Sequence, residues 1–177
     1  MRMTTAAPLT REHTSAALPD VLAFMQLLWA VSHGLERRSK RMTSDLGVTG
    51  PQRLVLRVVG LSPGLSAGDL AATLHVHPST LTGVLRRLVQ QKLLDRVDDP
   101  RDRRRAVLRL TKPGGRTNAT RTGTVESAIA EALNGVRAHD RAAARRVFER
   151  LADHLDPDAP GVIRAPRRRQ RKARGAR

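Results

Sequence analysis

The feature of this sequence that most restricts its fold is a series of closely spaced helix-start signals between residues 49 and 78. Thr49 and Gln52 have the spacing of a capping box, in which each satisfies a backbone donor at the start of a helix, and Ser66 and Asp69 repeat it. Pro78 suits the first turn of a third helix because its fixed φ is compatible with helix and its missing N–H is not needed there. These signals predict three short helices in succession.

Two β-prone segments follow these helices. Residues 93–97 (LLDRV) and 106–110 (AVLRL) are predicted strands, with a charged loop at 98–105 (DDPRDRRR) between them. Two short helices joined by a tight turn and followed by a hairpin have the element order of a winged helix-turn-helix. The predicted fold class is therefore mostly α, with a small β-hairpin wing and further helices on both sides.

The third of these helices, residues 78–88 (PSTLTGVLRRL), has two unlike faces. At about 100° per residue its apolar side chains gather on one side and its short polar side chains, with one arginine, on the other. The apolar set is Leu81, Val84, Leu85 and Leu88, and the polar set is Ser79, Thr82, Gly83 and Arg86. A face with hydroxyls and a cation but no acid suits the floor of a DNA groove. The alternative is an ordinary amphipathic helix with a solvated polar face.

Charge favours a polyanionic partner. Lysine and arginine number 33 against 16 acids, a net charge of +17 in 177 residues, and eight of these charges lie in the acid-free segment 164–177. Such an excess points to nucleic acid or an acidic membrane surface. The predicted loop adds Arg101, Arg103, Arg104 and Arg105. Its guanidinium groups suit phosphates or a minor groove, and Asp102 can orient one of them, although charged turns are commonly just solvated.

Several classes of protein are excluded by what the sequence lacks. It has no cysteine and none of the common nucleotide-binding or hydrolase motifs, so we expect no enzyme and no cofactor. Neither a signal peptide nor a membrane span is recognisable, which predicts a cytoplasmic protein that does not bind membranes. Among six histidines, His75 and His77 form an H-x-H without a third ligand at suitable spacing, so we expect no metal site. His77 is instead expected to cap the following helix or to approach a phosphate.

The segment LTGVLRRLVQQKLLDRVDDPRDRRRAVLRLTKPG resembles the MarR family of winged-helix transcriptional regulators, with similarity extending over roughly residues 20–155. The most specific match is the wing pattern Asp102-Arg103-Arg104, followed by Leu110-Thr111 and Gly114. The resemblance implies that Arg104 enters the minor groove and that Asp102 orients it. It also implies a DNA-binding set on the recognition helix and wing: Ser79, Thr80, Thr82, Arg86, Arg87, Asp102, Arg103, Arg104 and Arg105. This chain departs from the family pattern at His77, where a small polar or acidic cap is usual, and at Arg105.

The resemblance further implies a homodimer built from terminal helices. We expect a disordered segment at 1–18, a winged-helix domain at 19–155 and a linker with a disordered arginine-rich tail at 156–177. Within the domain we expect a DNA-binding lobe at about 49–111 and dimerisation helices at about 20–43 and 112–155. Three apolar helical stripes outside the lobe fit this organisation: Val21, Phe24, Met25, Leu28, Val31 and Leu35; Val125, Ile129, Ala132, Leu133 and Val136; Ala144, Val147, Phe148, Leu151 and Leu155. A second copy would bury these stripes, and the alternative is a bundle within one chain.

Many members of the family bind small anionic or aromatic effectors in a cleft between the dimerisation helices and the lobe. Trp29 with His33, and Arg53 with Arg57, are each one helical turn apart and could form an aromatic wall and an anion clamp. The alternatives are that Trp29 belongs to the dimer core and that the arginines are solvated or touch DNA.

The sequence thus predicts a DNA-binding transcriptional regulator, acting as a ligand-responsive homodimeric repressor on double-stranded DNA with a pseudo-palindromic operator. The alternative is a non-specific architectural DNA- or RNA-binding protein driven by its charge. In either case the basic tail would act as a sequence-independent clamp on nucleic acid.

Overall fold

The computed structural model describes residues 19–99 and 102–157, and for 102–105 it describes the backbone only. The expected disorder of 1–18 and of most of the tail therefore concerns residues outside this description. The chain divides into two compact units, Met1–Gly34 and Leu35–Arg177. Helix α1 (Asp20–Leu46) begins in the first unit and ends in the second. It extends three residues beyond the predicted 20–43, and Asp20 is its first residue rather than a cap before it.

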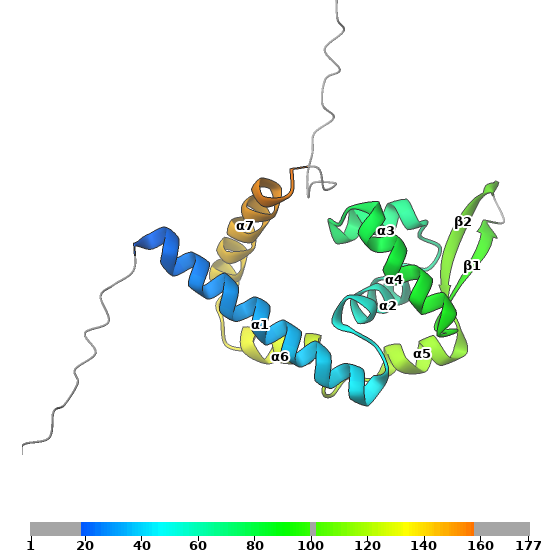
Figure 1. The fold of residues 1–177 in the computed structure, drawn as a ribbon, viewed down its shortest axis with the longest axis horizontal. Coiled ribbons are helices and arrows are strands. Elements are labelled where there is room, and N and C mark those ends of the chain that lie inside the picture. Colours follow the sequence, from blue (N-terminus) through cyan, green and yellow to red (C-terminus); the bar gives the residue numbers. More distant parts are fainter. Residues whose placement is uncertain (1–18, 100–101, 158–177) are drawn as a thin grey trace, which may run out of the picture. The chain divides into compact units, whose positions relative to one another are not determined.

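The second unit contains a helix-turn-helix followed by a hairpin (Figure 1). Its further elements are α2 (Gly50–Leu61), α3 (Ala67–Leu74), α4 (Pro78–Gln90), β1 (Leu94–Asp99), β2 (Asp102–Leu110), α5 (Lys112–Ala119), α6 (Val125–Leu133) and α7 (Ala138–Leu155). The predicted fold class, mostly α with a two-stranded wing, is confirmed.

Both predicted capping boxes are present. The backbone N–H of Thr49 donates to Oε1 of Gln52 at 2.8 Å, and that of Gln52 donates to Oγ1 of Thr49 at 3.4 Å. At the start of α3, the backbone N–H of Ser66 donates to Oδ2 of Asp69, and that of Asp69 donates to Oγ of Ser66, both at 3.2 Å. These side chains satisfy N–H groups that have no partner within the helix, which fixes where α2 and α3 begin.

The core of the second unit lies between the first helices of the lobe and the hairpin. Its buried side chains come from five elements and from Val48 before α2: Val55, Leu56 and Val59 of α2, Leu70 and Ala71 of α3, Leu81, Leu85 and Leu88 of α4, Leu94 of β1 and Leu108 of β2. The period of three and four residues in the helices and of two in the strands brings these side chains to one side of each element. The core therefore holds α4 by its apolar face.

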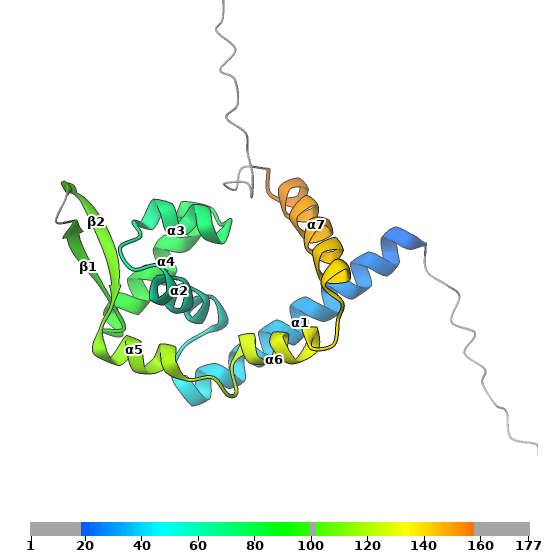
Figure 2. The same ribbon diagram turned by 180° about the vertical axis from the view of Figure 1, so that it is seen from behind.

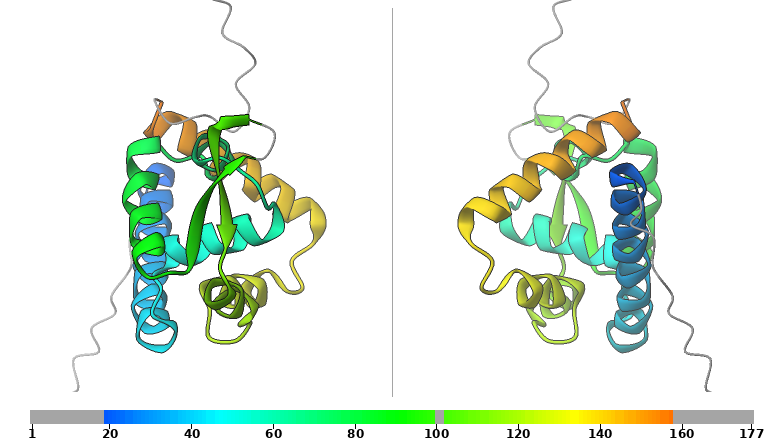
Figure 3. Two further views of the ribbon diagram at one scale, coloured as in Figure 1. Left: turned by 90° about the vertical axis from the view of Figure 1, so that its right-hand side faces the viewer. Right: turned by 90° about the vertical axis from the view of Figure 1, so that its left-hand side faces the viewer.

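The hairpin is longer than the sequence predicts. The strands pair antiparallel from Leu94 opposite Leu110 to Asp98 opposite Ala106, and an irregularity follows before Asp99. Residues 102–105, predicted as loop, belong to strand β2, and Asp102 pairs with Asp99 beyond the irregularity. On its other edge β2 pairs with the segment before α3, where the N–H of Leu108 donates to the carbonyl of Leu65 at 2.9 Å. The hairpin lies across helix α2 in the side view of Figure 3.

Helix α5 lies at the base of the hairpin, beside α2 and β2 (Figure 2). Thr111 caps it by accepting a hydrogen bond from the N–H of Gly114 at 3.0 Å. Gly114 packs so closely on the carbonyl group of Leu93 that a Cβ at this position would overlap its oxygen. The two glycines of the TKPGG segment are therefore not equivalent, because a Cβ at Gly115 would meet nothing within 4 Å.

Large apolar side chains remain exposed in both units. In the second unit neither α6 nor α7 has a fully buried side chain, and both carry exposed members of the predicted stripes: Ile129, Leu133, Val147, Phe148 and Leu155. Val136, predicted in the first of these two stripes, follows the end of α6. Within the first unit, α1 exposes Val21, Leu22, Phe24, Met25, Leu27, Trp29 and Val31. The described chain alone therefore leaves these faces uncovered.

Candidate nucleic-acid interface

Helix α4 presents a polar face to solvent. Leu81, Leu85 and Leu88 anchor the opposite face in the core. All five side chains of this helix that were predicted to contact DNA are exposed: Ser79, Thr80, Thr82, Arg86 and Arg87. No residue from Pro78 to Gln90 is acidic, and neither arginine of the helix has an ion pair with any residue that the structure describes. The face can therefore offer donors and uncompensated positive charge to an anion.

The start of α4 is fixed by an imidazole. The backbone N–H of Ser79 donates to Nδ1 of His77 at 3.3 Å, and Oγ of Ser79 lies 2.7 Å from the same nitrogen. A nitrogen that accepts a hydrogen bond carries no proton, so a neutral His77 carries its proton on Nε2. The expected capping role of His77 is confirmed.

One hydroxyl on this face is partly committed to the helix itself. Oγ1 of Thr82 donates to the carbonyl of Pro78, four residues earlier, at 2.8 Å. Its single proton is then engaged, and its oxygen remains available only as an acceptor. Thr82 can therefore accept a hydrogen bond from a base amino group but can donate one only by giving up its bond to the helix.

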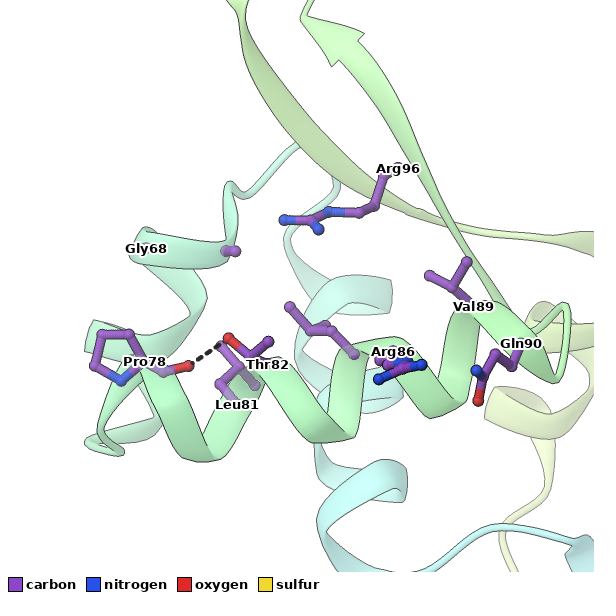
Figure 4. A pocket seen from close by; sticks show the side chains of 10 residues that line it. Gly68, Pro78, Leu81, Thr82, Arg86, Val89, Gln90 and Arg96 are labelled. Carbon is purple, nitrogen blue, oxygen red and sulfur yellow. Dashed lines mark hydrogen bonds between the residues drawn. The ribbon is translucent and has the colours of Figure 1, made fainter.

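A notch of about 410 Å³ runs along one side of α4 (Figure 4). It is lined by Ala67 and Gly68 of α3, by Pro78, Leu81, Thr82, Leu85, Arg86, Val89 and Gln90 of α4, and by Arg96 of β1. None of these side chains is acidic. Arg96 reaches from its strand over the notch, so the hairpin contributes a second cation beside that of Arg86.

The wing residues lie on strand β2. The structure places the backbone of Asp102, Arg103, Arg104 and Arg105 at the outer end of the hairpin, while their side chains lie outside its description. The predicted contacts of Arg104 with a minor groove and of Asp102 with Arg104 therefore stay predictions.

Arg53 was predicted to bind an anionic effector together with Arg57. In the structure its guanidinium instead contacts groups of its own chain. Its guanidinium is only 1% exposed, and its Nη2 lies 2.5 Å from Oε1 of Glu126. It also donates to the carbonyls of Thr117 and, at 2.6 Å, of Thr120. Arg53 thereby joins α2 to the connection between α5 and α6. Burial tends to raise the pKa of Glu126, but the hydrogen bonds and positive charge of Arg53 hold that pKa below its usual value.

The other three predicted effector residues are more accessible. In the second unit the Arg57 side chain is 25% exposed and its Nη1 donates to Oδ1 of Asn118 at 3.1 Å. In the first unit Trp29, 72% exposed, stacks on His33 with ring centroids 5.6 Å apart. The effector roles of Trp29, His33, Arg53 and Arg57 stay predictions.

The described residues contain neither a metal-binding group nor a membrane-spanning helix. No group of three or more histidine, cysteine or acidic side chains there could hold a metal ion. No helix among them is long and apolar enough to cross a membrane.

Comparison with known proteins identifies the family. A model of the MarR family matches residues 46–105. An HTH-type transcriptional repressor of Mycobacterium tuberculosis is 30% identical over 134 residues, which are 76% of this chain and 96% of the relative. The chain belongs to the MarR family.

Other relatives match over shorter stretches. The organic hydroperoxide resistance transcriptional regulator of Bacillus subtilis is 31% identical over 88 residues, which are 50% of this chain and 60% of the relative. A putative transcriptional regulatory protein of Thauera aromatica is 36% identical over 76 residues, 43% of this chain and 46% of the relative. The chain thus spans about half the length of these two relatives. All three relatives are named as regulators or repressors of transcription, in agreement with the predicted lack of catalysis.

Solved structures share the MarR fold. The PcaV transcriptional regulator of Streptomyces coelicolor, in complex with its natural ligand, has a TM-score of 0.63 at 28% identity, covering 79% of this chain and 99% of its own. MarR of Oenococcus oeni has a TM-score of 0.64 at 20% identity, covering 73% and 98%. The second of these likenesses concerns the fold alone.

Residues that sequence reasoning missed lie mainly at contacts between elements. Arg96 and Gln90 line the notch, and Glu126 and the fully buried Thr124 hold the connection before α6. The start of α6 has a detectable signal, since Thr124 caps it and Glu126 lies in its first turn. Nothing in the sequence pairs Glu126 with Arg53, 73 residues earlier.

Proposed function

We propose that this MarR-family chain is a sequence-specific DNA-binding regulator that acts as a homodimeric repressor. The observation that carries the proposal is the exposed face of α4, where hydroxyls and two arginines without ion pairs to described residues occur with no acid. A helix of this kind can enter the major groove and hydrogen-bond to base edges. The wing residues Asp102, Arg103, Arg104 and Arg105 would then reach the adjacent minor groove.

Repression is supported by the named relatives. The relative from M. tuberculosis, matched over 96% of its length, is a transcriptional repressor. A repressor needs to occupy its operator more tightly than other DNA, and this demands contacts to bases in addition to charge. The polar face of α4 supplies side chains for both.

A homodimer is supported by the exposed apolar side chains. α6 and α7 leave Ile129, Val147 and Phe148 uncovered, and α1 does the same with Phe24 and Trp29 in the first unit. Exposed apolar patches of this kind mark interaction surfaces. A two-fold dimer would also match the symmetry of a pseudo-palindromic operator.

A small-molecule effector is supported by one structural relative. PcaV was solved with its natural ligand and is 28% identical to this chain. We propose that this chain also binds a small molecule, and that this molecule is anionic or aromatic, as predicted from the sequence, and changes DNA binding. Because the donors of Arg53 are directed to its own chain, Arg57 is the more available of the two arginines for such a ligand.

The proposal is tested by selection of duplexes from a random pool with the full chain. We expect a consensus with two related half-sites about one helical turn apart, and the same consensus with a chain shortened to residues 1–162. Failure to enrich any sequence, with binding that disappears with the basic tail, would instead favour the non-specific nucleic-acid binder.

A further inference from the structure

Arg96 lies on the same face of strand β1 as the core residue Leu94, but it lies outside the core and is exposed. Leu94, two residues earlier and on the same face, is buried, and so is Leu108, directly opposite Arg96 in the ladder. Side chains two residues apart on a strand, and those directly opposite across a ladder, share a face. Arg96 therefore extends from the face that packs on α4, and it reaches over the notch beside that helix (Figure 4).

The notch is lined by two positively charged side chains and by no negatively charged one. Arg96 and Arg86 both line it, and no acidic side chain does. Neither arginine has an ion pair with another residue in the part of the chain that the structure describes. A cavity lined by cations and by no acid attracts an anion.

The position of Arg96 along the hairpin indicates which anion this is. The major and minor grooves of a duplex are separated by one sugar-phosphate backbone. A lobe that places α4 in the major groove and the outer end of the hairpin in the adjacent minor groove has to straddle that backbone. Arg96 lies between these two parts of the lobe, two residues from the buried base of β1 at Leu94 and three from its end at Asp99.

We propose that Arg96 binds the backbone phosphate between the two grooves. The inference rests on the proposed function, because it presumes that α4 enters DNA. Since a phosphate carries no sequence information, Arg96 would contribute affinity without choosing bases. Arg86, on the exposed face of α4, would contribute to base choice.

The test compares Arg96→Gln with a matched control, Arg109→Gln. Arg109 is an exposed arginine of the same hairpin, but it lies opposite Asp95, on the other face of the ladder. Each variant loses one positive charge, and thermal unfolding checks that each remains folded. Binding is measured by fluorescence anisotropy, at several salt concentrations, to a duplex selected by the full wild-type chain and to a scrambled duplex.

We expect Arg96→Gln to weaken binding to both duplexes by the same factor, about five- to tenfold, with the preference between them unchanged. The slope of log affinity against log salt should become shallower by about 0.9, the value for one lost phosphate contact. Arg109→Gln should stay within about twofold of wild type, because a rim charge outside the contact contributes little.

Two results would overturn the assignment: a loss in Arg96→Gln no larger than that in Arg109→Gln, or a loss confined to the selected duplex, which would make Arg96 a base-reading residue. Failure of the proposed function is a separate result. Wild-type protein would then show no preference between the duplexes, whatever the two variants do.

Discussion

Among single residues, Arg53 has a guanidinium group that is held by partners on other residues, which include Thr117, Thr120 and Glu126. It is buried, and its charge is balanced by Glu126, whose own side chain remains 37% exposed. A buried charge that loses its partner is costly, because the low-dielectric surroundings no longer compensate it. The pair therefore makes the attachment of α6 to α2 depend on the ionisation of one carboxyl group.

This dependence predicts how stability changes with pH. In the folded state the pKa of Glu126 is lowered from its usual value of 4.5. Ionised Glu126 therefore stabilises the folded state above pH 4.5, and this stabilisation is lost as the pH falls through the lowered pKa. In urea unfolding at pH 7, Glu126→Gln should be less stable than wild type by about 1–2 kcal/mol, a value reduced for the partial exposure of the carboxylate. The difference should shrink below pH 4.5.

The control for this experiment is Glu131→Gln, on the same helix. Glu131 is exposed and has no ion pair in the described part of the chain, so its removal should change stability by no more than about 0.5 kcal/mol. A difference between wild type and Glu126→Gln that stays constant from about pH 7 to about pH 3.5 would show that the charge of Glu126 is not what stabilises the fold.

His77 gives a second prediction at this scale. Its Nδ1 caps α4, and the oxygen of an asparagine side chain can occupy a similar position. Thermal unfolding should show His77→Ala to be destabilised by about 1 kcal/mol and His77→Asn to be at least as stable as wild type. Equal stability of the alanine variant and wild type would mean that the imidazole cap contributes nothing to folding.

At the scale of elements, the close contact between α5 and the base of the hairpin depends on one glycine. A Cβ on residue 114 would overlap the carbonyl oxygen of Leu93, whereas one on residue 115 would point into open space. Gly114→Ala should therefore cost about 3 kcal/mol or more, because rigid backbone has to move, and Gly115→Ala should be neutral or stabilising by up to about 1 kcal/mol. Urea unfolding of the two variants measures this difference, and similar values for both would contradict the packing described.

Local sequence signals predicted most of the helices and strands. Features that depend on contacts between elements were not predicted. Thr49, Ser66 and Pro78 marked three helix starts because capping and proline geometry are decided within one turn. The hairpin was predicted too short, because its charged end looks like a loop in the sequence, and the pairing of Asp102 with Asp99 beyond an irregularity has no local signal. Arg96 was missed for a related reason, since only the packing of β1 beside α4 brings it to the notch.

In the whole molecule, we expect a second copy of the chain to cover the exposed apolar side chains of the helices. Sedimentation of the full chain should give twice the chain mass, and Phe148→Asp, on an exposed part of α7, should shift it toward the monomer. Ala142→Asp adds the same charge on the opposite side of α7 and should leave the mass unchanged. A monomeric wild type, or equal behaviour of the two variants, would contradict this use of α7.

We expect the exposed face of α4 to read DNA sequence. The ratio of affinities for a selected and a scrambled duplex, measured at about 150 mM salt with wild type and Arg86→Ala, tests this claim. We predict a wild-type preference of at least about a thousandfold, and a reduction of about tenfold or more in the variant, since one good base contact is worth about 1–3 kcal/mol. A wild-type ratio near one, or an Arg86→Ala ratio equal to that of wild type, would contradict the claim.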